Sequence, residues 1–174
     1  MSDLARLLVR LDGTGVVLTT AFEGRLAGCF ATYVGAASMD PPRLIACTSH
    51  ENLTHELVDR SGVLAVHVLG RAHAGLVERF GLQSGRFADK FEGLAYRLGE
   101  TGAPILADCL GWIEGSVLAS FETGDHTARL VEPVAGCLAD HASTPLTSFE
   151  VLGRGLDRRS PPSGRWTGYE PDQP

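Results

Sequence analysis

Residues 25–58 read RLAGCFATYVGAASMDPPRLIACTSHENLTHELV, and this stretch decides the fold that we expect. Residues 26–34 predict a strand that returns from a hairpin turn at Glu23-Gly24. MDPPRL interrupts the pattern, because a proline pair cannot lie in a central strand. Residues 44–48 predict the next strand. A helix follows, with Asn52 or Thr54 as its N-cap and Gly62 at its end.

The same alternation of short strands and turns continues on both sides of this stretch. Gly124-Asp125 predicts a second hairpin turn. Because short antiparallel strands need no helical crossovers, we expect a mostly β fold, a closed or nearly closed antiparallel barrel with a few short helices. The remaining elements that we expect are strands over 15–20, 63–69, 110–123 and 126–136, helices over 3–10 and 73–82, and a loop over 83–104 that carries a brief strand near 95–98.

The chain of 174 residues fits one domain. We place that domain at residues 1–152. Residues 153–174 have little apolar periodicity and many Gly, Pro and Arg residues, which predicts an extended or partly disordered tail. Trp166 and Tyr169 are its two large aromatic residues, and we expect them to dock on the barrel or on a second subunit.

Charge and hydropathy exclude several classes of function. The formal net charge of -6 argues against nucleic acid as a partner. Apolar runs stay shorter than the roughly 18 residues that a membrane span needs. Asp3, Arg6 and Arg10 interrupt any signal-peptide core, so we expect a cytoplasmic protein.

Cysteines and histidines give no metal motif. The four cysteines form no CxxC pair, which argues against zinc and predicts four small buried hydrophobes. His50 and His55 are five positions apart and miss the i, i+4 spacing of a helical metal site. His67 lies in the middle of a predicted strand and is expected to be a core or sheet-face residue.

A phosphate site is the chemistry that residues 49–57 favour. Ser49, Asn52 and Thr54 surround the start of the predicted helix. A helix N-terminus offers free N–H groups and a partial positive charge, which suit a phosphate, although plain helix capping explains the same residues.

The order of the motifs resembles the flavin reductase-like family, the FMN-binding split barrels. SGVLAVHVL (61–69), GRFADKFEGL (85–94), TGAPIL (101–106), the Trp112-x-Glu114 strand and GDHT (124–127) follow in the family's order. The resemblance covers roughly residues 12–136. In residues 25–58 the family pattern is carried by Gly28, Thr32, Ser38, Asp40, Pro41, Pro42, Thr54, His55, Glu56 and Leu57.

The resemblance implies a split barrel that binds FMN, or alternatively FAD, with NADH or NADPH as co-substrate. It also implies that His126 lies near the ring and takes part in nicotinamide binding or hydride transfer. Phe30 and Tyr33 depart from the family and are expected to alter flavin affinity or to stack on the ring. The cofactor-binding residues implied are Phe30, Ala31, Thr32, Tyr33, Cys47, Thr48, Ser49, Asn52, Leu53, Thr54, Lys90 and Phe91.

The resemblance predicts an NAD(P)H:flavin oxidoreductase that supplies reduced flavin to an acceptor such as a monooxygenase, and a homodimer. Two alternatives stay open at this point. One is an FMN-bearing electron carrier without nicotinamide activity, and the other is a barrel that binds haem or another planar ligand through His50, His67 or His126. Arg25, Arg86, Arg129 and Arg154 are all candidates for a 2′-phosphate contact, and no motif chooses among them.

Overall fold

The computed structural model describes residue 11 and residues 13–153. The helix expected over 3–10 and nearly all of the tail expected over 153–174, with Trp166 and Tyr169, lie outside these described residues.

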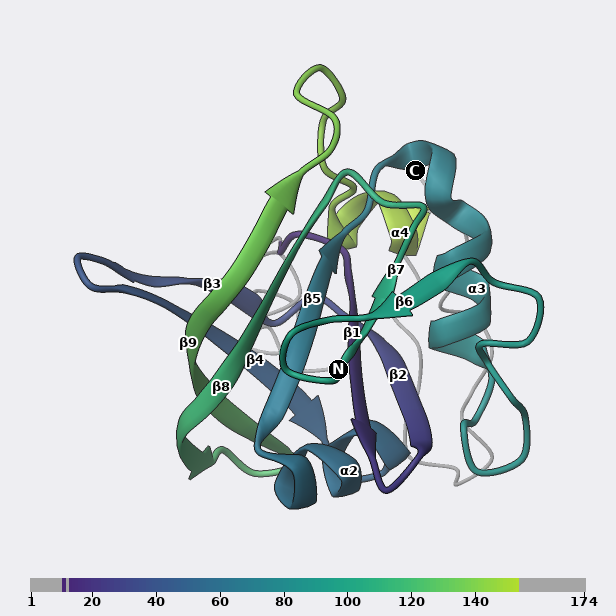
Figure 1. Ribbon diagram of the computed structural model, residues 1–174. Helices are drawn as coiled ribbons and strands as arrows, with labels where there is room; N and C mark the ends of the chain where they lie inside the picture. Colours follow the sequence, from purple (N-terminus) through teal and green to yellow (C-terminus); the bar gives the residue numbers. More distant parts are fainter. Residues whose placement is uncertain (1–10, 12, 154–174) are drawn as a thin grey trace.

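Seven strands form one antiparallel sheet in the order β2-β1-β5-β8-β9-β4-β3 (Figure 1). The two edge strands, β2 and β3, are consecutive in the chain and are joined only by Thr32 and Tyr33, so the two edges of the curled sheet meet at one corner. This arrangement confirms the predicted mostly β antiparallel fold. The strands of this sheet are β1 (Val16–Phe22), β2 (Arg25–Ala31), β3 (Val34–Met39), β4 (Pro42–Ser49), β5 (Val63–Val68), β8 (Gly111–Glu122) and β9 (His126–Leu138).

The prediction of a single strand over 26–34 was wrong. The chain bends at Thr32 and Tyr33 and continues as β3, which pairs with β4 instead of β1. The N–H of Cys47 holds the bend by donating to the carbonyl of Tyr33 at 2.9 Å. The backbone of Gly13 also packs closely against the bend, because a Cβ at this position would come within 2.1 Å of the Thr32 carbonyl oxygen. Only glycine permits that approach.

The turns were predicted correctly. Glu23 and Gly24 have positive φ angles of 49° and 78°, which two-residue hairpins of the favoured type require. Gly62 ends the first long helix in the left-handed region, with its N–H on the carbonyl of Val58. The helices are α2 (Leu53–Ser61), η1 (Arg71–His73), α3 (Ala74–Leu82) and α4 (Ser148–Gly153).

A small hairpin covers part of the sheet. It pairs β6 (Tyr96–Leu98), which was predicted, with β7 (Pro104–Leu106), which was not. Buried Glu114 of β8 holds its turn by accepting bonds from the N–H groups of Glu100 and Thr101 at 3.0 and 2.9 Å. The hairpin, a separate two-stranded sheet, is thus anchored to the barrel by a buried carboxylate.

Two main apolar clusters fill the molecule. Val16 and Leu18 of β1 point into the barrel, whereas Val17 points out toward α3 and packs near Phe80. Figure 1 shows α2 across one end of the barrel and α3 beside β2. Among the described residues, no helix is both long and apolar enough to cross a membrane.

The prediction of four buried cysteines holds only in part. Cys29 and Cys109 are buried, Cys47 is half-buried and Cys137 is exposed. Cys137 lies near the end of the long strand β9, where the chain extends past the part of the sheet that covers the core.

Candidate functional site

The ends of β4 and β9 and the start of α2 meet at one place. Ser49 is the register partner of His126, and Thr48 is the partner of Thr127. The N–H of His50 donates to the carbonyl of Asp125 at 3.1 Å, which joins the β8–β9 turn to the segment that leads into α2. Residues 49–54 and His126, far apart in the sequence, are therefore neighbours.

Alternation along β4 sorts the predicted residues into two layers. Ala46 and Thr48 point into the barrel, whereas Cys47 and Ser49 point outward. Among the sequence-predicted site residues, Phe30, Ala31, Thr32, Tyr33, Cys47, Ser49, Asn52 and His126 have exposed surface, whereas Thr48, Leu53, Thr54, Lys90 and Phe91 are at most 5% exposed.

Tyr33 and His126 form one wall of the outer layer. Their rings are 5.5 Å apart in an edge-to-face arrangement, and Tyr33 remains 49% exposed. The Nδ1–H of His126 donates to the carboxylate of Asp125 at 2.8 Å. This bond lowers the pKa of Asp125. With Nδ1 engaged, Nε2 is the nitrogen of His126 that is available to a ligand.

The N-terminus of α2 supplies the polar part of the outer layer. Asn52 is the N-cap residue, but its side chain makes no capping bond. The first N–H groups of an α-helix have no intrahelical acceptor. Ser49, half-exposed, lies just before this end. Hydroxyl, amide and N–H donors therefore gather at one point, and this donor set fits a phosphate.

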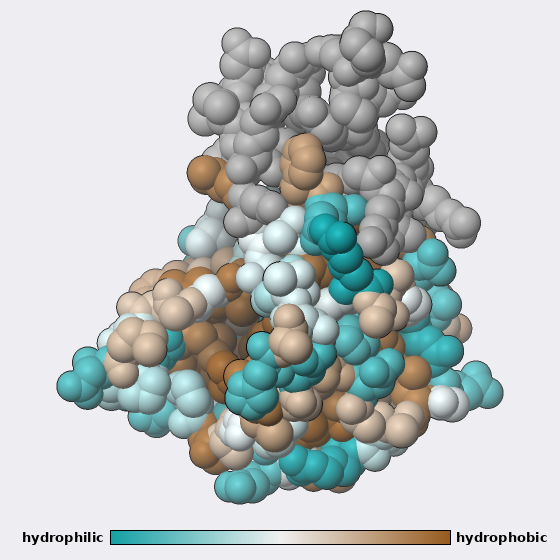
Figure 2. Space-filling model, turned by 90° about the horizontal axis from the view of Figure 1, so that it is seen from above, coloured by the Kyte–Doolittle hydropathy of each residue, from teal (hydrophilic) through white to brown (hydrophobic). Residues whose placement is uncertain are grey.

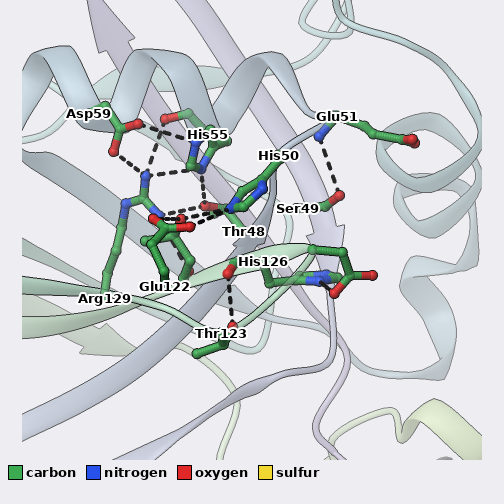
Figure 3. A network of polar contacts seen from close by, with 12 residues as sticks. Thr48, Ser49, His50, Glu51, His55, Asp59, Glu122, Thr123, His126 and Arg129 are labelled. Atoms are coloured by element: carbon green, nitrogen blue, oxygen red, sulfur yellow. Dashed lines mark hydrogen bonds and ion pairs between the residues drawn. The ribbon is translucent and has the colours of Figure 1, made fainter.

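The inner layer is a network of buried polar groups that supports the outer one (Figure 3). Arg129 of β9 is completely buried and contacts Thr48, His55 and Asp59. The Nδ1 of His55 accepts a bond from Arg129, which can only donate, and burial lowers the pKa of the ring. Next to this group, the Nε2 of His50 lies 3.1 Å from both the hydroxyl of Thr127 and the carboxylate of Glu122.

Lys90, Phe91 and Phe30 lie in or against the core. The ammonium of Lys90 donates to the carbonyls of Gly28 and Phe80 at 3.0 and 2.9 Å, and burial lowers its pKa. Phe91 belongs to the cluster around Phe80. Phe30 packs against the same cluster and is half-buried, so of the two departures from the family Tyr33 has the more exposed ring.

His67 cannot serve as a haem ligand in this structure. Its Nδ1–H donates to the carbonyl of Val17 at 3.0 Å, and its Nε2 accepts the N–H of Leu106 at 3.0 Å. The residue is completely buried. Both ring nitrogens are thus occupied by the backbone.

Sequence reasoning missed the role of Arg129, which it treated only as one candidate for a 2′-phosphate contact. A fully buried guanidinium cannot reach such a ligand. Arg86, another of those candidates, pairs with Glu56 on α2. Only the register of β9 against β4, which places Arg129 opposite Ala46, would have revealed its inward position.

Comparison with known proteins gives a consistent result. The family model described as "Flavin reductase like domain" matches residues 9–151. The chain is 33% identical over 128 residues to FMN reductase (NADH) RutF 2 of Rhizobium rhizogenes, which covers 74% of this chain and 73% of the relative. It is 36% identical over 116 residues to high molecular weight rubredoxin of Moorella thermoacetica, covering 65% of this chain but only 51% of that protein.

A solved structure extends the comparison to the fold. The crystal structure of a nitrilotriacetate monooxygenase component B homologue from Mycobacterium thermoresistibile superposes with a TM-score of 0.75 at 25% identity. The match covers 83% of this chain and 80% of that one.

Proposed function

Because the chain belongs to the flavin reductase-like family, we propose that it is an NAD(P)H:flavin oxidoreductase. The observation that carries this proposal is the gathering of Tyr33, Ser49 and His126 beside the start of α2, within the region that the family model matches. A flavin bound here would supply the redox chemistry, as the acceptor of the hydride whose loss oxidises the reduced nicotinamide.

FMN is the flavin that we propose. The Thr32–Tyr33 bend, Cys47 and His126 would hold its ring. Ser49, Asn52 and the N–H groups of Leu53 and Thr54 would hold its phosphate. The side chains of Leu53 and Thr54 are buried, so these two residues act through their backbone. A single phosphate at one helix end accounts for the donors described above.

His126 is the proposed catalytic residue. Asp125 holds its Nδ1–H, so the ring keeps one orientation while Nε2 faces the ligand. Only the imidazolium, which carries a proton on Nε2 as well as on Nδ1, would donate to a neighbouring ring and stabilise negative charge that develops there. Replacing such a group reduces rates by roughly 10²–10³-fold.

Steady-state oxidation of NADH and NADPH by the purified protein with FMN tests the activity. We expect turnover with at least one nicotinamide, and a fall in kcat of about 10²-fold in His126→Ala. Asp108→Ala is the control: it removes a histidine–carboxylate pair outside the site, that of Asp108 with His73, and should leave kcat unchanged. If neither nicotinamide is oxidised while a yellow protein accepts electrons from a protein donor, the molecule is an electron carrier and the proposal fails.

A monooxygenase is the proposed consumer of the reduced flavin, because the monooxygenase component described above has the same fold and is 25% identical. Coupled turnover with such an oxygenase tests this. If the reduced flavin from this protein does not support turnover of a given oxygenase, that oxygenase is excluded as the acceptor.

We also propose a homodimer. Apolar side chains gather in a hollow on the side of β3, β4, β8 and β9 (Figure 2). Exposed contiguous apolar surface of this kind marks an interface. Light scattering should give twice the monomer mass for the parent protein. The Phe121→Asp variant should give the mass of one monomer. The exposed large apolar side chains on these strands are Met39, Ile45, Ile113, Leu118, Phe121, Val134 and Leu138.

A further inference from the structure

Arg129 is the largest fully buried side chain in the described part of the chain. It projects from β9 into the barrel between β4 and α2, beneath residues 49–54 (Figure 3). These residues, which we call the 49–54 segment, carry the proposed phosphate contacts. Arg129 itself has no exposed surface and cannot touch a ligand.

The guanidinium contacts the chain immediately before and immediately after the 49–54 segment. On one side, Nη1 donates to the hydroxyl of Thr48 at 2.7 Å. On the other, Nη2 donates to Nδ1 and to the carbonyl of His55 at 3.1 and 3.3 Å. Nη2 also pairs with the carboxylate of Asp59, one turn further along α2. One rigid planar group thus fixes both ends of the segment.

Stability alone explains this arrangement poorly. Burying a charge costs free energy, and apolar residues of similar volume often replace a buried ion pair without loss. The carboxylate partner, Asp59, is 49% exposed, and the Nε of Arg129 has no partner among the described residues. Besides Asp59 and the carbonyl of Thr127 on its own strand, the guanidinium bonds to Thr48 and His55, the two residues that border the 49–54 segment.

Contacts among Arg129, His55 and Asp59 fix the orientation of all three side chains. Because Nδ1 of His55 accepts from Arg129, the ring proton is on Nε2, which lies 3.2 Å from the carboxylate of Asp59. Arg129, His55 and Asp59 therefore form a closed triangle that fixes the first turn of α2. The direction of the N–H groups at the start of that helix depends on this turn.

We propose that Arg129 is a positioning residue that holds the 49–54 segment in the geometry that binds the flavin phosphate. The inference rests on the proposed function, since it assigns a buried support to the proposed phosphate site. It predicts that replacing Arg129 weakens recognition of the phosphate and leaves contacts with the flavin ring intact.

The affinities for FMN and for riboflavin, which lacks the phosphate, separate these two effects. Both are measured by fluorescence quenching on the full chain. For Arg129→Met we expect the ratio of FMN to riboflavin affinity to fall at least about tenfold, with riboflavin affinity within about threefold of the parent value. Arg129→Lys keeps the charge but lacks the planar fork, and its ratio should fall about fivefold or more. Both variants should fold, because the exposed carboxylate of Asp59 stays hydrated when its partner is removed. If Arg129→Met does not fold, the affinity ratio of Arg129→Lys alone decides the test.

Glu114→Gln is the matched control, since Glu114 is also a buried charged residue but supports the β6–β7 hairpin. Its affinity ratio should equal that of the parent protein. If the parent binds FMN and riboflavin equally, the proposed phosphate site is wrong and this inference falls with it. If the parent prefers FMN and the Arg129 variants keep that preference, the phosphate site stands and the role of Arg129 is refuted.

Discussion

His67 makes the stability of this barrel dependent on pH in a way that one substitution can isolate. The neutral ring donates from Nδ1 to the carbonyl of Val17 and accepts at Nε2 from the N–H of Leu106. It therefore joins β1 to the β6–β7 hairpin. A proton on Nε2 would remove the acceptor and leave two donors facing each other.

The size of the effect follows from the pKa. Burial lowers the pKa of His67 from 6.5 to about 4. Above the unfolded value both states are neutral and the full stability is present. As the pH falls, the unfolded chain binds a proton that the folded protein refuses, so stability is lost until the folded value is reached. The total loss is about 3 kcal/mol, of which about 2 kcal/mol has gone at about pH 5.

Urea unfolding of the flavin-free protein between about pH 7.5 and pH 5 measures this loss. His67→Gln is the comparison, because an amide supplies a donor and an acceptor but does not titrate. Glu114 and Asp125 have lowered pKa values and also lose stabilisation in acid, but they do so equally in both proteins. The parent should lose about 2 kcal/mol more than the variant over this range. Parallel curves would refute the buried neutral imidazole.

Three substitutions, with Gly35→Ala as a control for the third, test other contacts by thermal or urea unfolding. Glu114→Gln weakens the bonds from the N–H groups of Glu100 and Thr101 and should cost about 1–3 kcal/mol, with faster amide exchange in the hairpin turn; unchanged exchange would contradict this. Lys90→Met removes two bonds to backbone carbonyls and should cost about 2 kcal/mol; an unchanged FMN affinity would exclude the direct flavin contact predicted from sequence. Gly28→Ala places a Cβ 2.6 Å from the ring of Phe80 and should cost about 1–3 kcal/mol, whereas Gly35→Ala, with open space around it, should be close to neutral.

The fold could be predicted where local chemistry decides the chain path. Glu23-Gly24, Gly62 and Gly124-Asp125 each mark a turn or a helix end through residues that accept positive φ or a tight reversal. The break after Ala31 could not be predicted, because the apolar pattern runs on through Val34. The break depends instead on contacts with Gly13 and Cys47, which are distant in the sequence.

Strand β7 was missed for a different reason. Its three residues are too short to show a period, and it exists because buried Glu114 and the ring of His67 bind the hairpin backbone. Both groups lie on other strands. The residues of Pro104–Leu106 alone therefore could not predict this strand.

Motif order and helix-terminus physics set what the sequence can predict of the candidate site. These gave the start of α2 and His126 separately, and the register of β4 against β9 brings them together. Arg129 was missed because an arginine in a strand predicts an exposed position. Its burial requires Thr48, His55 and Asp59 as partners, and no short motif contains all of them.

Residues of the predicted site therefore differ in what their substitution can reveal. Ser49, Asn52 and His126 have exposed surface, so their replacement can change a direct contact with a ligand. Thr48 is buried and bonded to Arg129, so its replacement acts on the ligand only through the 49–54 segment. A loss of flavin affinity is the same observation in both cases. Only the comparison of FMN with riboflavin, made for an outer and an inner residue side by side, distinguishes the contact from its support.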